Sequence, residues 1–261
     1  RFFPGNSQGS SASRIAESFF TNIISRCDML VDLHTGSFRR TNLPQLRANL
    51  TNPEVKNLAK RMGAIVVVQS DGAEGTLRRA AVDAGIPAVT LEAGAPHELS
   101  PKDIEHGVKS IESAMDSLGM IKRRRFWERE AEPVYYESSW VRATDGGMLF
   151  SDVGVGAQVQ AGDLLGTVTD PITNRRSEIR APYGGQVIGM ALNQVMFPGF
   201  AAYHIGHAAA MPEASTLVEP LEGQTEGDAH AEPGIDNEAS VAEGEAPIEE
   251  RVELMPIEDS E

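Results

Sequence analysis

The 261-residue sequence has a single cysteine, Cys27, and no apolar run long enough to cross a bilayer. One cysteine excludes an internal disulfide and suits a reducing compartment. The absence of a long apolar run argues against a membrane protein. The opening residues, Arg-Phe-Phe-Pro-Gly, also lack the basic region and apolar core of a secretory signal. We therefore expect a cytoplasmic protein with no membrane partner.

Basic residues are scarce at one end of the chain. Residues 211–261 hold 16 of the 38 acidic residues and one of the 23 basic residues, which leaves 22 of each sign elsewhere. This segment is poor in aromatics and rich in Glu, Ala, Pro and Gly, so it cannot bury enough apolar surface to fold. We predict a disordered acidic tail over 211–261. We expect no nucleic-acid partner, because no extended basic surface remains.

The first half of the chain alternates between helical and strand patterns. Four segments have helical spacing or helix-start residues: 11–26, 53–62, 76–84 and 101–118. Three apolar runs predict buried strands: 29–34, 64–69 and 87–92. The segment after Gly36 is polar and basic and is predicted to be a loop. This alternation favours an α/β domain over 1–125, with a mostly parallel sheet and helices on both faces.

Glycines become frequent after a basic cluster at 122–125, which we interpret as a helix end or linker. From 139 to 205, short apolar runs separated by glycines predict a small all-β sandwich domain over 126–210. Residues 153–205 resemble a biotinyl or lipoyl carrier domain. Such carriers present a lysine on a hairpin, and the corresponding segment 169–176 has none. We therefore expect a structural or substrate-shaping role for this domain.

Two of the predicted strands end on polar side chains, His34 and Glu92. Parallel strands open at one edge of a sheet, and ligand sites lie just beyond that edge. An imidazole there can bind a metal ion, and Asp32 lies on the same side of the strand. A histidine at a strand end is also commonly a hydrogen-bonded structural residue, so the residues alone leave both interpretations open. The histidines at 106, 204, 207 and 230 lack ligand spacing and are predicted to be structural.

Three segments together carry a family resemblance. They are RFFPG at 1–5, DLHTG at 32–36 followed by Arg40, Asn42 and Pro44, and TLEAG at 90–94. In this order and spacing, the chain resembles the succinylglutamate desuccinylase/aspartoacylase family, whose fold is similar to that of the zinc carboxypeptidases. Members of that family are zinc hydrolases that remove acyl groups from N-acyl amino acids or related small amides.

The resemblance implies roles for single residues. His34 matches a zinc ligand, and Glu92 matches the catalytic glutamate of a Glu-x-Gly motif. Arg1 matches an arginine that helps to hold the substrate carboxylate, and Arg40 and Asn42 are further candidates for substrate binding. The family's other two zinc ligands come from an upstream His-x-x-Glu motif, and this sequence has none before Arg1. We therefore expect a partial catalytic domain that alone binds zinc weakly and is inactive.

The resemblance thus predicts that the full-length protein is a deacylase in which zinc activates a water and Glu92 is the general base. Two alternatives remain open. One is a non-catalytic remnant whose β domain is a binding module, and the other is a zinc carboxypeptidase acting on peptides. The sequence leaves undecided the acyl group, the amino acid, the preference for amide or ester, and whether the protein is a homo-oligomer.

Overall fold

The structure is a computed structural model that describes residues 1–37, 39–63, 65–96, 98–122, 134–135, 137–192 and 195–207. The predicted tail over 211–261, His97, His230 and all of the basic cluster but Lys122 lie outside these residues. The described residues belong to one compact unit of the chain. None of the described helices is long and apolar enough to cross a membrane.

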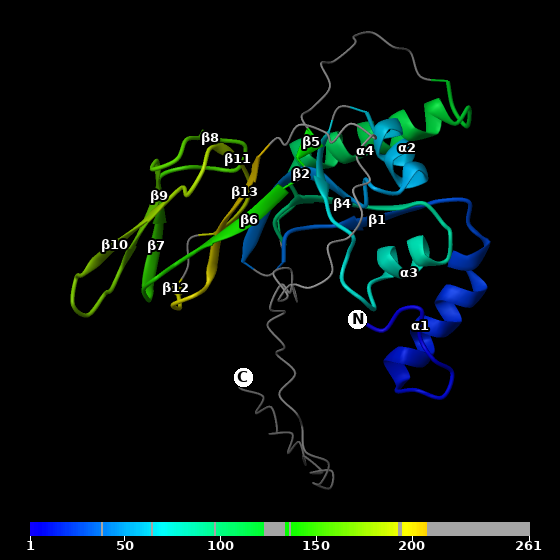
Figure 1. Ribbon diagram of the computed structural model, residues 1–261, viewed down its shortest axis with the longest axis horizontal. Helices are drawn as coiled ribbons and strands as arrows, with labels where there is room; N and C mark the ends of the chain where they lie inside the picture. Colours follow the sequence, from blue (N-terminus) through cyan, green and yellow to red (C-terminus); the bar gives the residue numbers. More distant parts are fainter. Residues whose placement is uncertain are drawn as a thin grey trace, which may run out of the picture. The chain divides into compact units, whose positions relative to one another are not determined.

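The first half of the chain contains the predicted helices and strands and one further strand (Figure 1). The helices are α1 (Ser11–Asn22), α2 (Pro53–Arg61), α3 (Leu77–Asp83) and α4 (Pro101–Ser117), with a 3₁₀ turn at Ile24–Arg26. The strands are β1 (Leu30–His34), β2 (Arg40–Ala48), β3 (Val66–Gln69) and β4 (Ala88–Gly94). Ser100 caps α4, since its hydroxyl accepts a hydrogen bond from the Asp103 amide.

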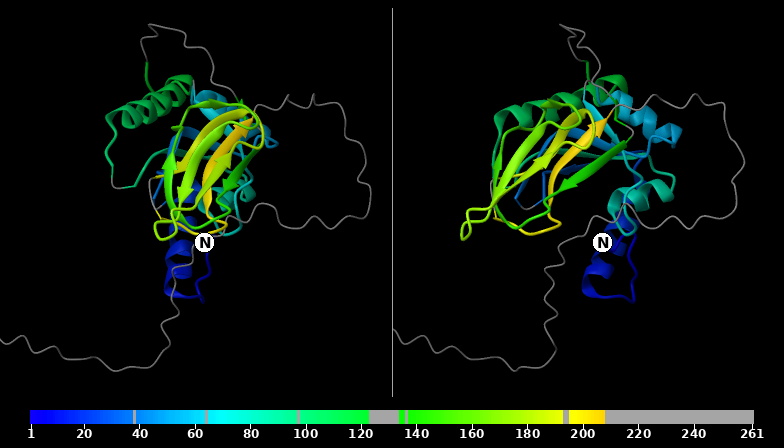
Figure 2. Two further views of the ribbon diagram at one scale, coloured as in Figure 1. Left: turned by 90° about the vertical axis from the view of Figure 1, so that its left-hand side faces the viewer. Right: turned by 60° about the vertical axis from the view of Figure 1, so that its left-hand side comes forward.

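The second half contains strands only among the described residues, and Figure 2 shows these green-to-yellow strands gathered side by side. They are β5 (Val134–Tyr135), β6 (Glu137–Arg142), β7 (Gly147–Ser151), β8 (Gln158–Val159), β9 (Leu164–Thr169), β10 (Arg176–Arg180), β11 (Gly185–Ala191), β12 (Val195–Met196) and β13 (Ala201–His207). The predicted boundary at 125/126 falls outside the described residues, so the domain limits stay a prediction.

The sheet topology corrects two expectations. The larger sheet has nine strands along the path β1-β4-β2-β11-β13-β6, with β3, β5 and β8 attached to it. It is mixed rather than mostly parallel, because β1–β4, β2–β3 and β3–β5 are parallel and β2 is antiparallel to both β4 and β11. The segment expected to be a polar loop is largely strand β2, and its pairing with β11 joins the sheet of the first half to the later strands.

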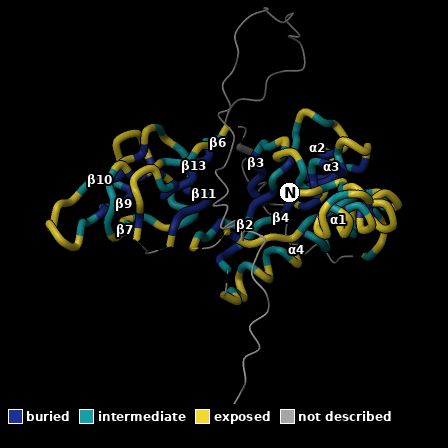
Figure 3. The backbone as a smooth tube through the Cα atoms, turned by 90° about the horizontal axis from the view of Figure 1, so that it is seen from below, coloured by how far each residue is buried: buried dark blue, intermediate teal, exposed yellow. Residues whose placement is uncertain are grey.

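Apolar side chains form four clusters around these strands, the smallest of which contains Val66, Val68 and Ile188, and the buried positions in Figure 3 follow the strands. Leu46, Val89 and Leu91 pack against α2 and α4 on one face of the sheet. Leu30 and Ala88 pack against α1 and α3 on the other face. A third cluster lies between the larger sheet and the four-stranded sheet β10-β9-β7-β12. The strands that carry polar side chains are therefore supported by apolar packing on both faces.

Candidate active site

The parallel pairing of β1 and β4 places His34 directly opposite Glu92, because the two residues are Cα partners in the sheet. Asp32 pairs with Thr90 two positions earlier, so Asp32, His34 and Glu92 share one face. The opposite face carries Val89 and Leu91, which are buried against α2 and α4. The alternation of apolar and polar residues in these strands thus produces an apolar face and a face with acid and imidazole groups at one edge.

His34 is half-exposed, and its Nε2 lies 3.0 Å from Oδ2 of Asp32. This hydrogen bond is the main reason that the pKa of His34 is raised, and the negative charge of Asp32 adds to it while partial burial opposes it. A carboxylate that binds one ring nitrogen fixes the orientation of the ring. The contact therefore leaves Nδ1 as the nitrogen that can bind another group.

Glu92 is largely buried and is bound through both oxygens by residues of β2. Its Oε1 lies 3.0 Å from Nε of Arg47, and its Oε2 accepts a hydrogen bond of 2.6 Å from Nδ2 of Asn42. Sequence reasoning missed Arg47. The signal was the alternation of Gln45 and Arg47 with the apolar Leu46 and Ala48, which is typical of a strand. The arrangement holds the carboxylate in one orientation.

A second arginine lies near this edge. Arg78 of α3 is buried, and its guanidinium donates to the carbonyl oxygen of Ser70 at 2.6 Å and to the Ser70 hydroxyl at 3.1 Å. Burial, and then the charge of Arg47, lower the pKa of Arg78 to about 10, while the carboxylates of Glu92 and Asp32 oppose this shift. Arg78 is therefore still cationic at neutral pH.

The two arginines predicted to bind substrate lie away from Glu92 or have other contacts. Arg1 is exposed. Its segment lies against the loop before α3, since the Phe3 amide donates a hydrogen bond to the Gly75 carbonyl oxygen at 2.9 Å. The Arg40 guanidinium lies 4.6 Å from the centre of the Trp140 ring. Arg40 is thus in contact with β6, and the substrate-binding roles of Arg1, Arg40 and Asn42 stay predictions.

His204, on β13, is buried and has a different environment from His34. Its Nε2 is 3.0 Å from the Ser138 hydroxyl, and its ring stacks on Trp140 with 4.7 Å between centroids. Burial lowers the pKa of His204 to about 3, and the charges of Arg47 and Arg40 contribute to the shift. The ring is therefore neutral, which agrees with the structural role predicted for it.

A catalytic zinc ion takes three protein ligands and leaves one coordination position open for water or substrate. Within the described part of the chain, no group of three His, Cys, Asp or Glu side chains could hold a metal ion. His34 fits as one of the three ligands, with Asp32 holding its ring, because a carboxylate commonly binds the other nitrogen of a zinc-ligating histidine. A complete site therefore needs donors from outside the described residues.

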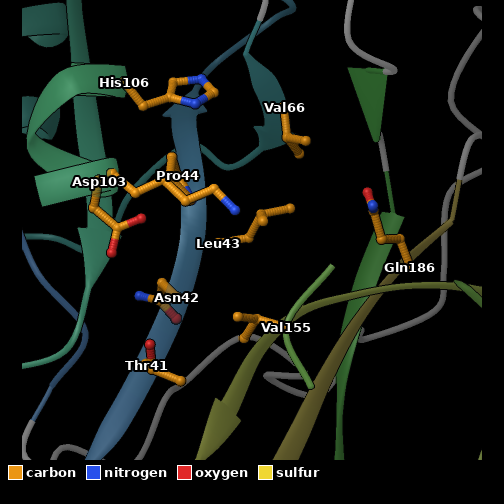
Figure 4. Close-up of a pocket in the computed structure, with 10 residues that line it drawn as sticks. Thr41, Asn42, Leu43, Pro44, Val66, Asp103, His106, Val155 and Gln186 are labelled. Carbon is orange, nitrogen blue, oxygen red and sulfur yellow. The ribbon is translucent and has the colours of Figure 1, made fainter. Parts of the chain in front are cut away.

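A pocket of about 410 Å³ lies beside Asn42, between β2, α4 and the later strands (Figure 4). Asp103 and His106 of α4 line one side, and Val155 and Gln186 line another. The lining combines an ammonium group, a carboxylate, an imidazole, a hydroxyl and two amides with four apolar side chains, so it suits a small ligand with both polar and apolar parts. Such a ligand would lie next to the side chain that binds Glu92.

Fold and site together define a mixed α/β protein with an acid and imidazole site at one sheet edge. Residues 1–118 match the model of the Succinylglutamate desuccinylase/Aspartoacylase catalytic domain, so this part of the chain is similar to the succinylglutamate desuccinylase/aspartoacylase family. Members of this family are hydrolases that deacylate small N-acyl amino acids. The predicted resemblance is thereby confirmed.

Solved structures show the same fold. The apo Ectoine utilization protein EutE (DoeB) from Ruegeria pomeroyi is 22% identical with a TM-score of 0.72, and the match covers 79% of this chain and 68% of that one. A succinylglutamate desuccinylase/aspartoacylase from Rhodobacter sphaeroides is 20% identical with a TM-score of 0.71, covering 80% and 67%. A succinylglutamate desuccinylase from Silicibacter sp. TM1040 is 20% identical with a TM-score of 0.69, and the match covers 79% of this chain and 66% of that one. The chain spans about two thirds of these relatives. No curated protein matches the sequence.

Proposed function

We propose that the protein is a zinc-dependent hydrolase that removes the acyl group from a small N-acyl amino acid or a related amide. The observation that carries the proposal is the register of β1 and β4, which sets Glu92 beside the His34–Asp32 pair. His34 lies in the segment that resembles the family's zinc-ligand motif, and Glu92 lies in the segment that resembles its catalytic motif. The placement of a carboxylate next to a metal-ligating imidazole is what metal-assisted hydrolysis requires.

Glu92 is assigned the role of general base. Its carboxylate has about four lone-pair sites, and the hydrogen bond from Asn42 occupies one of them, while Arg47 is an ion-pair partner at the other oxygen. The remaining sites can accept a proton from a water molecule and return it to the leaving amine. Because Arg47 and Asn42 hold the two oxygens, little reorientation is needed when the proton moves.

His34 is assigned the role of zinc ligand through Nδ1, with Asp32 holding the ring. The other ligands are expected from a His-x-x-Glu motif outside the described residues. Zinc, when bound, lowers the pKa of its water toward neutrality and polarises the carbonyl that is attacked. Arg78 adds a positive charge near this edge, which fits the carboxylate of an N-acyl amino acid, whereas the charge of Arg47 is already paired with Glu92.

The experiment compares Glu92→Gln with the wild type, using protein expressed from the complete coding region and a panel of N-acetyl and N-succinyl amino acids. Glutamine has nearly the shape of glutamate but cannot accept the proton, so turnover should fall by about 10²–10⁴-fold with zinc content unchanged. Glu178→Gln is the matched control, because Glu178 also pairs with an arginine, Arg180, on exposed β10. Loss of zinc in Glu92→Gln would make Glu92 a ligand, and normal turnover would exclude it as the base.

A further inference from the structure

Asn42 connects the proposed base to the strands that follow residue 137. On one side of β2, Asn42 is the Cα partner of Gly94 in β4, and on the other side it is the partner of Gly189 in β11. The register of β2 and β4 shifts between Asn42 and Gln45, and such irregularities re-aim side chains near active sites. The Asn42 side chain is buried between Glu92 and β11.

The orientation of the Asn42 amide follows from its partner. A carboxylate that is ionised only accepts hydrogen bonds, so the amide nitrogen must face Glu92, as the 2.6 Å contact has it. The amide oxygen is then turned toward Gly189. A Cβ atom on residue 189 would lie 2.6 Å from Oδ1 of Asn42, which is too close for a carbon–oxygen contact. The absence of a side chain at 189 therefore leaves the space that this orientation needs.

The requirement at 189 is one of space and not of backbone conformation, because Gly189 does not have a positive φ. The next nearest atoms to its Cβ would be Cβ of His204 at 3.5 Å and the Thr41 carbonyl oxygen at 3.6 Å, which are ordinary contacts. At Gly185, by contrast, a Cβ would meet the backbone oxygen of Gly206 at 2.4 Å. An alanine at 189 thus conflicts only with the end of one side chain, which can turn away while the fold is kept.

We propose that Gly189 is a positioning residue for Glu92, acting through Asn42, and that β11 is therefore part of the catalytic site. With alanine at 189, the Asn42 amide must rotate and its hydrogen bond to Glu92 is lost or bent. The carboxylate then keeps Arg47 as a partner but loses the contact on Oε2. This inference rests on the proposed role of Glu92 as the base.

The direct test is the NMR signal of the Asn42 side-chain NH₂ group in ¹⁵N-labelled protein, assigned by its loss in Asn42→Ala. In Gly189→Ala the signal should move toward the position of a solvent-exposed asparagine amide. Gly184→Ala is the control from the same part of the chain, because its Cβ would approach no atom closer than 3.5 Å. An Asn42 signal that is the same in Gly189→Ala and in the wild type would overturn the proposal.

Turnover provides a second and separate readout. Loss of a hydrogen bond to a charged group should lower kcat of Gly189→Ala about 10-fold to 100-fold, with KM nearly unchanged, whereas Gly184→Ala keeps the wild-type values. In an Asn42→Ala background, Gly189→Ala should have no further effect on kcat. A further loss there would overturn the proposal, since residue 189 would then act by another route. A wild-type protein that hydrolyses no N-acyl amino acid would refute the proposed function instead, and the NMR result would still decide the contact.

A loss of folding in Gly189→Ala is also informative. If the conflict is with Asn42 alone, adding Asn42→Ala to the same chain removes the crowded oxygen and should restore the melting temperature. A double variant that melts as low as Gly189→Ala would show that alanine clashes with something else, and the proposal would be wrong.

Discussion

The larger sheet holds one histidine on its end strand β1 and another on β13, next to the opposite end, and the two imidazoles have opposite properties. His34 on β1 is half-exposed beside Asp32, which raises its pKa. His204 on β13 is buried, and burial with the charges of Arg47 and Arg40 lowers its pKa to about 3. Both lie in strands with apolar neighbours in sequence. The difference shows that burial and the charged groups around the ring, on its own strand or on a neighbouring one, decide whether an imidazole is available for chemistry.

The strongest test of this comparison removes each ring in turn. We expect His34→Ala to lose bound zinc and turnover, the latter by at least the 10²–10⁴-fold typical of a lost catalytic group. His204→Ala should keep its zinc, because His204 already has Ser138 and Trp140 as partners. Zinc content by elemental analysis, beside turnover of an N-acyl amino acid, measures both. Equal loss of zinc in the two variants would show that His34 and His204 do not differ in their importance for metal binding.

The second prediction concerns acid stability. The folded-state pKa of His204 lies below the unfolded value, so its contribution to stability is fully present above pH 6.5 and is lost as the pH falls toward about 3. The loss is on the order of 1.4 kcal/mol for each pKa unit. His204→Phe, which keeps an aromatic ring on Trp140, should flatten the pH dependence of the free energy of unfolding in this window. Urea denaturation at several pH values measures it, and an unchanged slope would contradict the shift.

The third prediction concerns the ion pair that holds Glu92. Arg47→Met keeps most of the side-chain volume but leaves the Glu92 carboxylate, which is only 14% exposed, without its charged partner. The free energy of unfolding should fall by about 1–3 kcal/mol. Arg180→Met, which breaks an exposed pair with Glu178, should change it by less than about 1 kcal/mol. Equal effects would show that burial of the Glu92 pair has no energetic consequence.

The smallest expected effect is the contribution of His34 to the pH dependence of stability, and its sign is opposite to that of His204. Because the pKa of His34 is raised, its contribution to stability is present below pH 6.5 and is lost as the pH rises through the folded-state value. The effect is weak, since half of the side chain is in water. With a chelator present, the stability difference between wild type and His34→Gln should shrink from pH 5.5 to 8.5. A stability difference that grows with pH would contradict the raised pKa of His34.

The sequence predicted the edge of the sheet well and its middle poorly. His34 ends β1 and Glu92 lies two residues before the end of β4, so their common edge followed from the pattern. β2 was missed because Arg40, Asn42, Gln45 and Arg47 are polar. Gln45 is fully buried, and its amide has no hydrogen-bond partner among the described residues. A pattern of polar residues normally indicates a solvated segment, and only the partners on β4 and β11 show that this one is interior.

The register that joins β2 to β11 also has a consequence for the order in which the molecule can be assembled. Asn42 and its partner Gly189 are separated by almost 150 residues, whereas the His34–Glu92 pair closes over fewer than 60. Chains emerge from the ribosome at roughly 5–20 residues per second. The sheet edge with His34, and the β2 residues that contact Glu92, can therefore form while β11 is still unsynthesised. Glu92 then has its two partners before β11 lies beside Asn42, and activity should appear later than the fold of the first half.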